Sequence, residues 1–382
     1  MTEPAYPAAR ALAARLEAHF ARHLDAARER GDGDLAPLAQ AYAVEAMLSA
    51  AFWASLRREE GYEPTISLAF VSPDQVSRPL RFERRLRLLP GSLARLAPAV
   101  ERPGIHLGVW QDGGGLHVWG ATRSLPAFCF VLEVVAPGLL VVKHRRGRDA
   151  GKFVNVAVLE GDEIKIVDEH GTMMPGCPPV LESLLGAGSA APADDVDVPV
   201  NVAMQLAISI RAHRRGGALL VVPAGSDAWR ESIVRPVSYS LVPTQSEVAE
   251  LMRCDPAERL GVEWQESLRR AVDALAGLTA VDGATIVTDQ YELLAFGAKL
   301  RRRDGWDQVE QVLVTEPIEG AVRTTVDPAE LGGMRHLSAV QFVHDQRDAV
   351  ALVASQDGRF TIFAWSPKEE IVRGHRIEVL LM

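Results

Sequence analysis

Several features that would assign this protein to a specialised class are scarce in its sequence. The 382 residues include three cysteines, Cys129, Cys177 and Cys254, which are odd in number and far apart. This usage excludes a disulfide framework and a paired-cysteine zinc site, and it fits a reducing cytoplasm. The 41 lysines and arginines are outnumbered by 50 aspartates and glutamates. A net charge of −9 therefore argues against binding DNA or RNA by bulk charge.

Long apolar runs are also missing. A membrane helix needs about 18 consecutive apolar residues, and the longest apolar stretch, 128–142, is interrupted by Glu133, Pro137 and Gly138. The first thirty residues are rich in charge and do not resemble a signal peptide. We expect a cytoplasmic protein without membrane contact. The apolar fraction of 48% and charged fraction of 24% are those of ordinary globular domains, and the length suggests two of them.

The first half of the sequence predicts helices followed by strands. Apolar residues recur every four positions in residues 8–30, which predicts a helix, and a second helix is expected at about 35–58. From residue 65 to 168 the pattern changes to short apolar runs separated by turn residues. The glycine run 113–115 lacks dinucleotide-binding spacing and is interpreted as a hairpin turn. We predict an α+β unit with a mainly antiparallel sheet.

The second half alternates helices with buried strands. Residues 186–197, GAGSAAPADDVD, are small and acidic, and we interpret them as a linker. A polar loop is expected between residue 300 and a helix that begins near Arg335. The alternation predicts an α/β domain with a mixed sheet flanked by helices. The expected parts are a helical hairpin at 1–60, a β-rich domain at 61–185, the linker at 186–197 and the α/β domain at 198–382.

Common catalytic motifs are absent, and two weaker patterns remain. The sequence contains no phosphate-binding GxxxxGK[ST] loop, no HExxH and no GxSxG. His19 and His23 are four residues apart on a predicted helix, but no third metal ligand is near in sequence, so we interpret them as a solvated face. The basic residues between Lys143 and Lys152 indicate a solvated loop, with an anionic ligand or partner as the alternative.

Four segments occur in an order that is more specific than each alone. They are GALLVV at 217–222, DGA at 282–284, GGMRHLSA at 332–339 and DAVALVASQDG at 348–358. This set resembles the diadenylate cyclase domain, the catalytic module of the DNA-integrity-scanning protein, where the pattern runs GALIV, DGA, GTRHRAA and DAVVIVVSEETG. The resemblance covers about 198–382. The β-rich part before it looks like the sensor domains of the DACNV kind that accompany these cyclases.

The resemblance implies a reaction and roles for particular residues. Two ATP molecules would be joined into cyclic di-AMP with release of pyrophosphate. Asp282 would hold a divalent metal, Mn²⁺ or Mg²⁺, and help to remove the 3′-hydroxyl proton. Arg335 would pair with phosphate, and His336 would bind the metal or phosphate. The expected substrate-binding residues are Gly283, Ala284, Gly332, Gly333, Met334, Arg335, His336 and Ser355. The family's site forms between two facing domains, which implies a homo-oligomer.

The sequence departs from the family pattern at three places. Met334 replaces the usual Thr, Leu337 replaces the second Arg, and Gln356-Asp357 replaces two Glu. Each lost charge-assisted hydrogen bond weakens triphosphate binding by about 1.5–3 kcal/mol, unless Lys299 or one of Arg301–Arg303 substitutes. Three hypotheses follow: a cyclase making cyclic di-AMP or a related dinucleotide, a catalytically weakened nucleotide-binding regulatory protein, and a relative of the same fold that binds no nucleotide.

Overall fold

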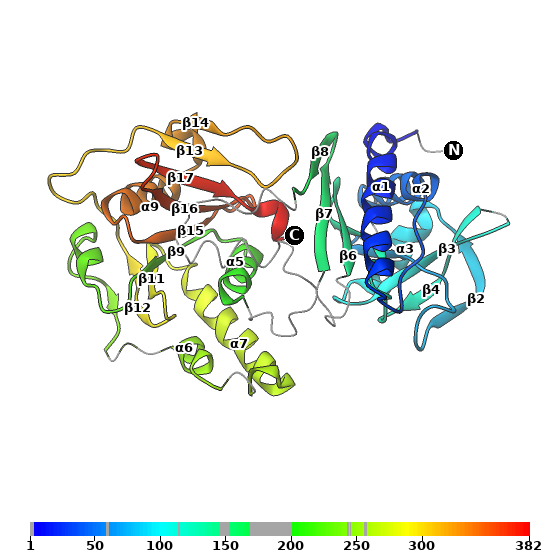
Figure 1. Ribbon diagram of the computed structural model, residues 1–382, viewed down its shortest axis with the longest axis horizontal. Helices are drawn as coiled ribbons and strands as arrows, with labels where there is room; N and C mark the ends of the chain where they lie inside the picture. The colour runs from blue at the N-terminus through cyan, green and yellow to red at the C-terminus, as the bar shows by residue number, and fades with distance from the viewer. Residues whose placement is uncertain are drawn as a thin grey trace. The chain divides into compact units, whose positions relative to one another are not determined.

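The computed structural model describes residues 4–58, 61–113, 115–145, 153–168, 201–242, 244, 246–255 and 258–382. The chain divides into two compact units, Met1–Val167 with Met382, and Asp168–Leu381. Each unit is built on one large sheet with helices packed against it (Figure 1). The expected linker at 186–197 lies outside the described residues. None of the described helices has the length and apolar character that a membrane crossing requires.

The first unit contains an eight-stranded sheet in the order β2-β4-β3-β1-β5-β6-β7-β8. Strands β1 and β3 run parallel, and the other neighbours run antiparallel. The predicted mainly antiparallel sheet is therefore confirmed. The elements are α1 (Pro7–Glu29), α2 (Ala41–Ser55), β1 (Ile66–Phe70), β2 (Leu80–Arg87), α3 (Pro90–Val100), β3 (His106–Asp112), β4 (Gly115–Thr122), β5 (Phe130–Ala136), β6 (Leu139–Arg145), β7 (Phe153–Glu160) and β8 (Glu163–Ile166).

The helical hairpin and the sheet share one core. Leu12, Leu16 and Phe20 of α1 are buried in the same cluster as Phe130 and Leu132 of β5. The apolar stripe that predicts α1 is thus the face that it buries against the sheet. Each fully buried side chain of this kind contributes about 1.5–3 kcal/mol. The hairpin therefore depends on the sheet for most of its stability.

Helix α2 begins later than predicted, and two elements were not predicted. Pro37 disfavours helical geometry in the residue before it, so α2 starts at Ala41 instead of near residue 35. Strand β2 is rich in arginine and mostly exposed, so its sequence lacks the alternation of apolar and polar residues that predicts a strand. Helix α3 begins with Pro90 and contains Pro98, and these prolines obscure the buried stripe on its inner face. Strands β3 and β4 pair antiparallel as expected for a hairpin, with Asp112 opposite Gly115.

The second unit contains a nine-stranded mixed sheet in the order β10-β12-β11-β9-β15-β16-β17-β13-β14. The predicted mixed sheet with flanking helices is confirmed. Its elements are α5 (Val202–Ala212), β9 (Gly217–Val222), η1 (Ala228–Ser232), β10 (Tyr239–Ser240), α6 (Glu247–Met252), η2 (Glu258–Leu260), α7 (Val262–Leu278), β11 (Ala284–Thr288), β12 (Leu293–Ala298), β13 (Val312–Thr315), β14 (Thr324–Val326), α8 (Pro328–Leu331), α9 (Met334–Asp345), β15 (Val350–Ala354), β16 (Phe360–Ser366), β17 (Ile371–Arg376) and η3 (Glu378–Leu380).

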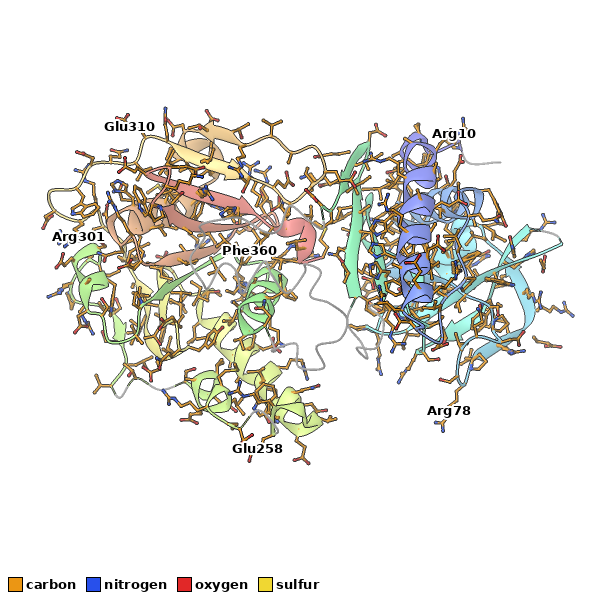
Figure 2. All side chains as sticks on the ribbon, in the orientation of Figure 1. Arg10, Arg78, Glu258, Arg301, Glu310 and Phe360 are labelled. Atoms are coloured by element: carbon orange, nitrogen blue, oxygen red, sulfur yellow. The ribbon has the colours of Figure 1, made fainter. Side chains whose placement is uncertain are left out.

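Alternate residues of the central strands face two different helical layers. On β9, Leu219 and Val221 belong to the core that contains α5 and α7, whereas Leu220 and Val222 belong to the core that contains α9. Phe360 of β16 is fully buried among these side chains (Figure 2). Because successive side chains of a strand point to opposite faces, both faces of the sheet are covered. The second unit is therefore a three-layer arrangement of helices, sheet and helices.

The expected polar loop after residue 300 is wrong in one respect. It contains β13 and β14, which pair with each other and continue the sheet beyond β17. Strand β13 has only four residues and polar neighbours on both sides. Its pairing is set by β17, a strand about sixty residues away in the sequence, so local pattern was not enough to predict it.

Candidate functional site

Strand register brings the candidate residues to one edge of the second sheet. Strands β9 and β11 run parallel, so the residues before each of them lie at the same edge. Strands β12 and β15 run antiparallel to their neighbours, with Ala298 opposite Ala284 and Ala354 opposite Gly217. The residues after β12 and β15 therefore lie at this edge too. We call it the charged edge, and its members are Arg215, Asp282, Lys299, Arg335 and Ser355.

Asp282 is the carboxylate of the charged edge. It precedes β11, its side chain is 87% exposed, and it forms an ion pair with Lys299, which follows β12. The hydrogen bond from Lys299 is the main cause that lowers the pKa of Asp282, and the charge of Arg335 acts in the same direction. Asp282 is therefore ionised at neutral pH. Asp282, Lys299 and Arg335 come from three different parts of the fold, and the charges of Lys299 and Arg335 both act on Asp282.

Arg335 lies over the backbone that leads into β9. A Cβ added to Gly216 would be 2.8 Å from Nη1 of Arg335, and this Nη1 donates a long hydrogen bond of 3.5 Å to the carbonyl of Arg215. Burial lowers the pKa of nearby His213, and the charges of Arg215 and Arg335 add to this effect. The sequence motifs did not indicate Arg215 and Gly216. Their signal in the sequence is a run of two arginines and two glycines at the beginning of a buried strand.

Gly283 and Ala284 are small for reasons internal to the fold. Gly283 has φ of +111°, and a Cβ there would lie 2.5 Å from the carbonyl carbon of Gly297 on β12. Ala284 is buried and pairs with Ala298. The space beside Gly283 is thus occupied by the neighbouring strand β12. These two residues fix the position of Asp282.

The start of α9 leaves backbone N–H groups available. Its N-cap residue, Gly333, supplies no side-chain hydrogen bond, and the first turn contains no acidic residue. A Cβ on Gly333 would meet no atom within 4 Å, and the side chain of Met334 is 74% exposed. The first N–H groups of a helix have no acceptor within the helix and attract anions. This helix start is open and suited to a phosphate group.

His336 is buried below the same turn. It is 2% exposed, and its ring packs edge-on against Phe363 with centroids 6.0 Å apart. Gly332 makes room for it, because a Cβ there would be 2.7 Å from its Nδ1. Burial lowers the pKa of His336, with Asp357 opposing and Arg376 and Arg359 reinforcing this shift. His336 is therefore neutral at pH 7 and interacts with the turn between β15 and β16, whereas Asp282 interacts with Lys299.

Ser355 follows β15, and its hydroxyl donates to the carboxylate of Asp357. This hydrogen bond is the main cause that lowers the pKa of Asp357, and the charge of Arg359 also contributes. The distance from the backbone N–H of Arg359 to Asp357 is 3.2 Å. Asp357 thus holds this turn together in an ionised form. Ser355 is partly exposed and reaches the charged edge from the strand next to β9.

Leu337 stands where the family pattern has a second arginine. Of the cations expected to substitute for it, Lys299 lies at the charged edge. Arg301 binds Asp304 at 2.9 Å, and Arg303 binds Glu231 at 2.6 Å. These two arginines are therefore engaged by carboxylates of their own surroundings. Lys299 is the residue whose ammonium group already sits beside Asp282.

Two further predictions fall in the first unit. Lys143 lies 2.6 Å from Glu133, and Arg145 donates to the carbonyl of Leu125, so neither belongs to a simple solvated loop. Residues 146–152 lie outside the described residues. The interpretation of His19 as part of a solvated face is wrong, because His19 is only 7% exposed. It lies on the side of α1 that packs against the sheet.

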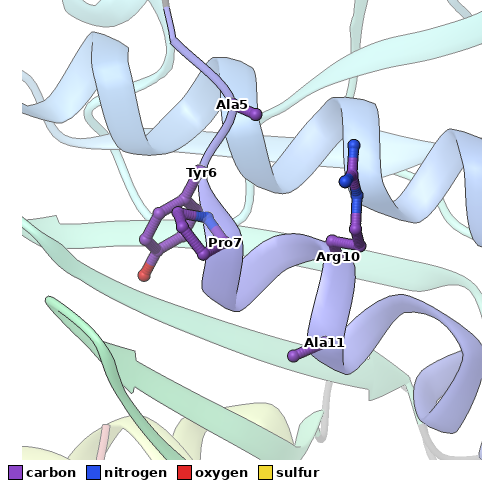
Figure 3. A pocket seen from close by; sticks show the side chains of 5 residues that line it. All are labelled: Ala5, Tyr6, Pro7, Arg10 and Ala11. Carbon is purple, nitrogen blue, oxygen red and sulfur yellow. The ribbon is translucent and has the colours of Figure 1, made fainter.

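A surface pocket of about 280 Å³ lies at the start of α1 (Figure 3). Its lining residues are Ala5, Tyr6, Pro7, Arg10 and Ala11. The Tyr6 hydroxyl donates to the carbonyl of Gly161, and burial raises its pKa to about 12. Among the residues that the structure describes, the lining contains no carboxylate, imidazole or thiol. These five residues therefore offer no acid–base pair and no usual metal ligand.

Comparison with known proteins identifies part of the first unit. Residues 33–123 match the family described as "Probable sensor domain DACNV". None of the curated proteins matches the chain. Among solved structures, a hypothetical membrane spanning protein from Bacillus cereus is 14% identical, with 51% of this chain and 71% of that chain covered and a TM-score of 0.28. That similarity is too low to define the fold. The segment that matches the sensor family begins shortly after α1 and ends just after β4.

Proposed function

We propose that the second unit is a nucleotide-binding domain of the diadenylate cyclase type, which joins two ATP molecules into cyclic di-AMP. The observation that carries the proposal is the gathering of Asp282, Lys299 and Arg335 beside the open start of α9. A triphosphate requires cations and backbone N–H donors, and the charged edge offers both next to one carboxylate. The order of the four sequence motifs supports the same assignment.

The reaction assigns a task to each group. Each 3′-hydroxyl oxygen attacks the α-phosphorus of the other ATP, the bond to pyrophosphate breaks, and the hydroxyl proton passes with the help of Asp282 to water. One cyclic product and two pyrophosphates result. When bound, Mg²⁺ or Mn²⁺ neutralises phosphate charge and acidifies the hydroxyl. Asp282 fits such a site, because an exposed, ionised carboxylate together with substrate phosphates is a usual ligand set for Mg²⁺.

The cations of the charged edge hold the triphosphate in this proposal. Arg335 and the N–H groups at Gly333 and Met334 face the phosphates. With a metal ion held by Asp282, the ammonium group of Lys299 would be available to supply the positive charge that Leu337 does not. His336 supports α9 from below, and the hydroxyl of Ser355 contacts phosphate or bound water.

A second candidate function is a regulatory protein that binds nucleotide without turning it over. The ion pair to Lys299 favours it, because a carboxylate whose pKa is lowered is a weak base. The exposed thioether of Met334 also supplies no hydroxyl at the helix start. In this case the second unit would report nucleotide to a partner through a change in its own conformation.

The test is an assay of the purified full-length chain with ATP and Mn²⁺ or Mg²⁺, with products separated by chromatography. The key variant is Asp282→Asn. The matched control is Asp304→Asn, since Asp304 is also ion-paired and its side chain is 86% exposed, against 87% for Asp282. Both variants remove one exposed charge from the same unit. Thermal melting of each protein with and without ATP measures binding independently of turnover.

Each outcome distinguishes the hypotheses. Cyclic dinucleotide from the wild type and Asp304→Asn, but not from Asp282→Asn, supports the cyclase. Stabilisation by ATP without product supports the regulatory protein. An absence of heat in calorimetry with every adenine and guanine nucleotide supports a fold relative that binds none, and it refutes both proposals.

The proposal extends to assembly and context. A cyclase of this type requires two second units face to face, so we propose a homo-oligomer, which light scattering of the purified chain would measure. The first unit would be the sensor that regulates the reaction, since part of it matches a sensor family. Because ATP is an intracellular substrate, a cytoplasmic location belongs to the same proposal.

A further inference from the structure

Three histidines from two elements meet on the helical face of the first unit's sheet. His19 and His23 are one turn apart on α1, and His144 is near the end of β6. One ring nitrogen of each lies within 4.8 Å of those of the other two. Tetrahedral zinc with Zn–N bonds of about 2.0–2.1 Å holds its nitrogens about 3.4 Å apart. Small side-chain rotations would therefore bring all three onto one ion.

The two cations of β6 lie on the face of the strand opposite to this cluster. Along β6, His144 shares a face with Leu140 and Val142, which belong to the core that α1 covers. Lys143 and Arg145 occupy the opposite face, where Lys143 binds Glu133 at 2.6 Å. The alternation of the strand thus separates the positive charges from the imidazoles. A divalent ion at the cluster would not meet these two cations directly.

Aromatic rings and a backbone carbonyl orient the imidazoles. The ring of Phe128 is 5.9 Å from that of His23 and 5.3 Å from that of His144, and Phe20 packs edge-on to His19 at 5.7 Å. Nδ1 of His144 lies 3.3 Å from the carbonyl oxygen of Arg145. A histidine that donates from one ring nitrogen to a carbonyl presents the other as a metal ligand. For His144 this ligand atom is Nε2.

We propose that His19, His23 and His144 form a binding site for Zn²⁺ or a chemically similar transition-metal ion. Imidazole ligands suit Zn²⁺, Co²⁺, Ni²⁺ and Cu²⁺, whereas Mg²⁺ and Mn²⁺ prefer oxygen. Three protein ligands leave a fourth position for water or a small anion. His19 and His144 are buried, while His23 is partly exposed and gives access to solvent. The first unit would then respond to a specific kind of metal ion. This site does not depend on the function proposed for the second unit.

The match to the sensor family does not imply this site. The matched segment is residues 33–123, and all three histidines lie outside it. Sequence spacing indicated only the pair on α1, since His144 is more than a hundred residues away. The packing of α1 on β6 creates the third ligand.

The experiment titrates the full-length chain, freed of any affinity tag and stripped of metal by a chelator, with Co²⁺. Four-coordinate Co²⁺ bound by imidazoles absorbs visible light, so the expected result is a visible band that saturates at one equivalent. Zn²⁺ should abolish the band, and excess Mg²⁺ should not. The variant His23→Gln changes the most exposed ligand. His117→Gln is the matched control, because His117 is a partly exposed histidine of the same unit on β4.

The proposal requires that His23→Gln weaken Zn²⁺ binding by at least about tenfold. Losing a residue that only hydrogen-bonds to a metal ligand already has an effect of this size. His117→Gln should bind as the wild type does. Zn²⁺ should raise the melting temperature of the wild type and of His117→Gln, but not that of His23→Gln, whose circular dichroism checks its fold. Absence of the cobalt band, or equal affinity in His23→Gln and wild type, would overturn the site.

Discussion

The charged edge of the second unit and the histidine cluster of the first differ in how much water reaches them. The side chains of Asp282 and Lys299 are 87% and 55% exposed, whereas His19 and His144 are 7% and 4% exposed. Exposed charges exchange partners at little cost, which suits a substrate that binds and leaves. Buried polar rings lose their hydration and need a lasting partner. The exposed groups would thus serve the substrate that we propose for the second unit, and the buried ones the metal ion that we propose for the first.

The largest expected effect concerns the backbone beneath the charged edge. Gly283→Ala should lower the free energy of unfolding by about 3 kcal/mol or more, because it adds a strained φ and an overpacked Cβ. The Cβ would lie 2.5 Å from a backbone atom of Gly297. The control is Gly333→Ala, where φ is −76° and the space is open. Urea titrations measure the free energy of unfolding of both variants. Equal values would show that the backbone at Gly283 does not constrain the charged edge.

Acid should destabilise both units through one buried histidine in each. Burial lowers the pKa of His106 and of His375 to about 4 from 6.5, and Ser67 and Thr315 contact their Nδ1 atoms at 2.7 and 2.6 Å. The folded pKa lies below the unfolded one, so this stability is complete above pH 6.5 and is lost as the pH falls toward 4. Each histidine accounts for about 3 kcal/mol.

Urea unfolding at pH 7 and near pH 4 measures the loss. His106→Gln should reduce the acid sensitivity of the first unit and leave that of the second. A variant whose unfolding depends on pH as steeply as the wild type's would contradict the assignment of this effect to His106.

A smaller effect is expected on ligand binding. Arg335→Ala removes a charge-assisted contact of about 1.5–3 kcal/mol, which should weaken ATP binding roughly 10- to 100-fold. Arg301→Ala is the control, since Arg301 is paired with Asp304. Calorimetric titration with ATP measures both. Equal affinities in the two variants would place the phosphates elsewhere on the second unit.

The smallest effect on stability is expected from Lys299→Ala. Its ion pair with Asp282 is exposed, so the melting temperature should stay unchanged. The pKa of Asp282 should rise toward its ordinary value, because Lys299 is the main cause that lowers it. Carboxyl titration followed by nuclear magnetic resonance measures this shift. A clear loss of thermal stability would show that the pair has a structural role and would weaken the contrast between the two sites.

Local pattern predicted the elements whose signal is local. The four-residue stripe of α1 and the buried runs of β9, β11 and β15 were found, because the period of apolar residues reflects the face that each element buries. The helix expected to begin near Arg335 begins at Met334. Elements held by distant partners, such as β2 and β13, were missed.

Sequence by itself determined the period of each element, the order of the motifs and the residue types available to them. Only the tertiary structure decided which of these residues meet. Strand register carries Lys299 to Asp282, the packing of α9 carries Arg335 to Gly216, and the packing of α1 carries His19 to His144. Periodicity is a property of neighbouring residues, whereas these contacts follow from burying apolar faces that lie far apart in the chain.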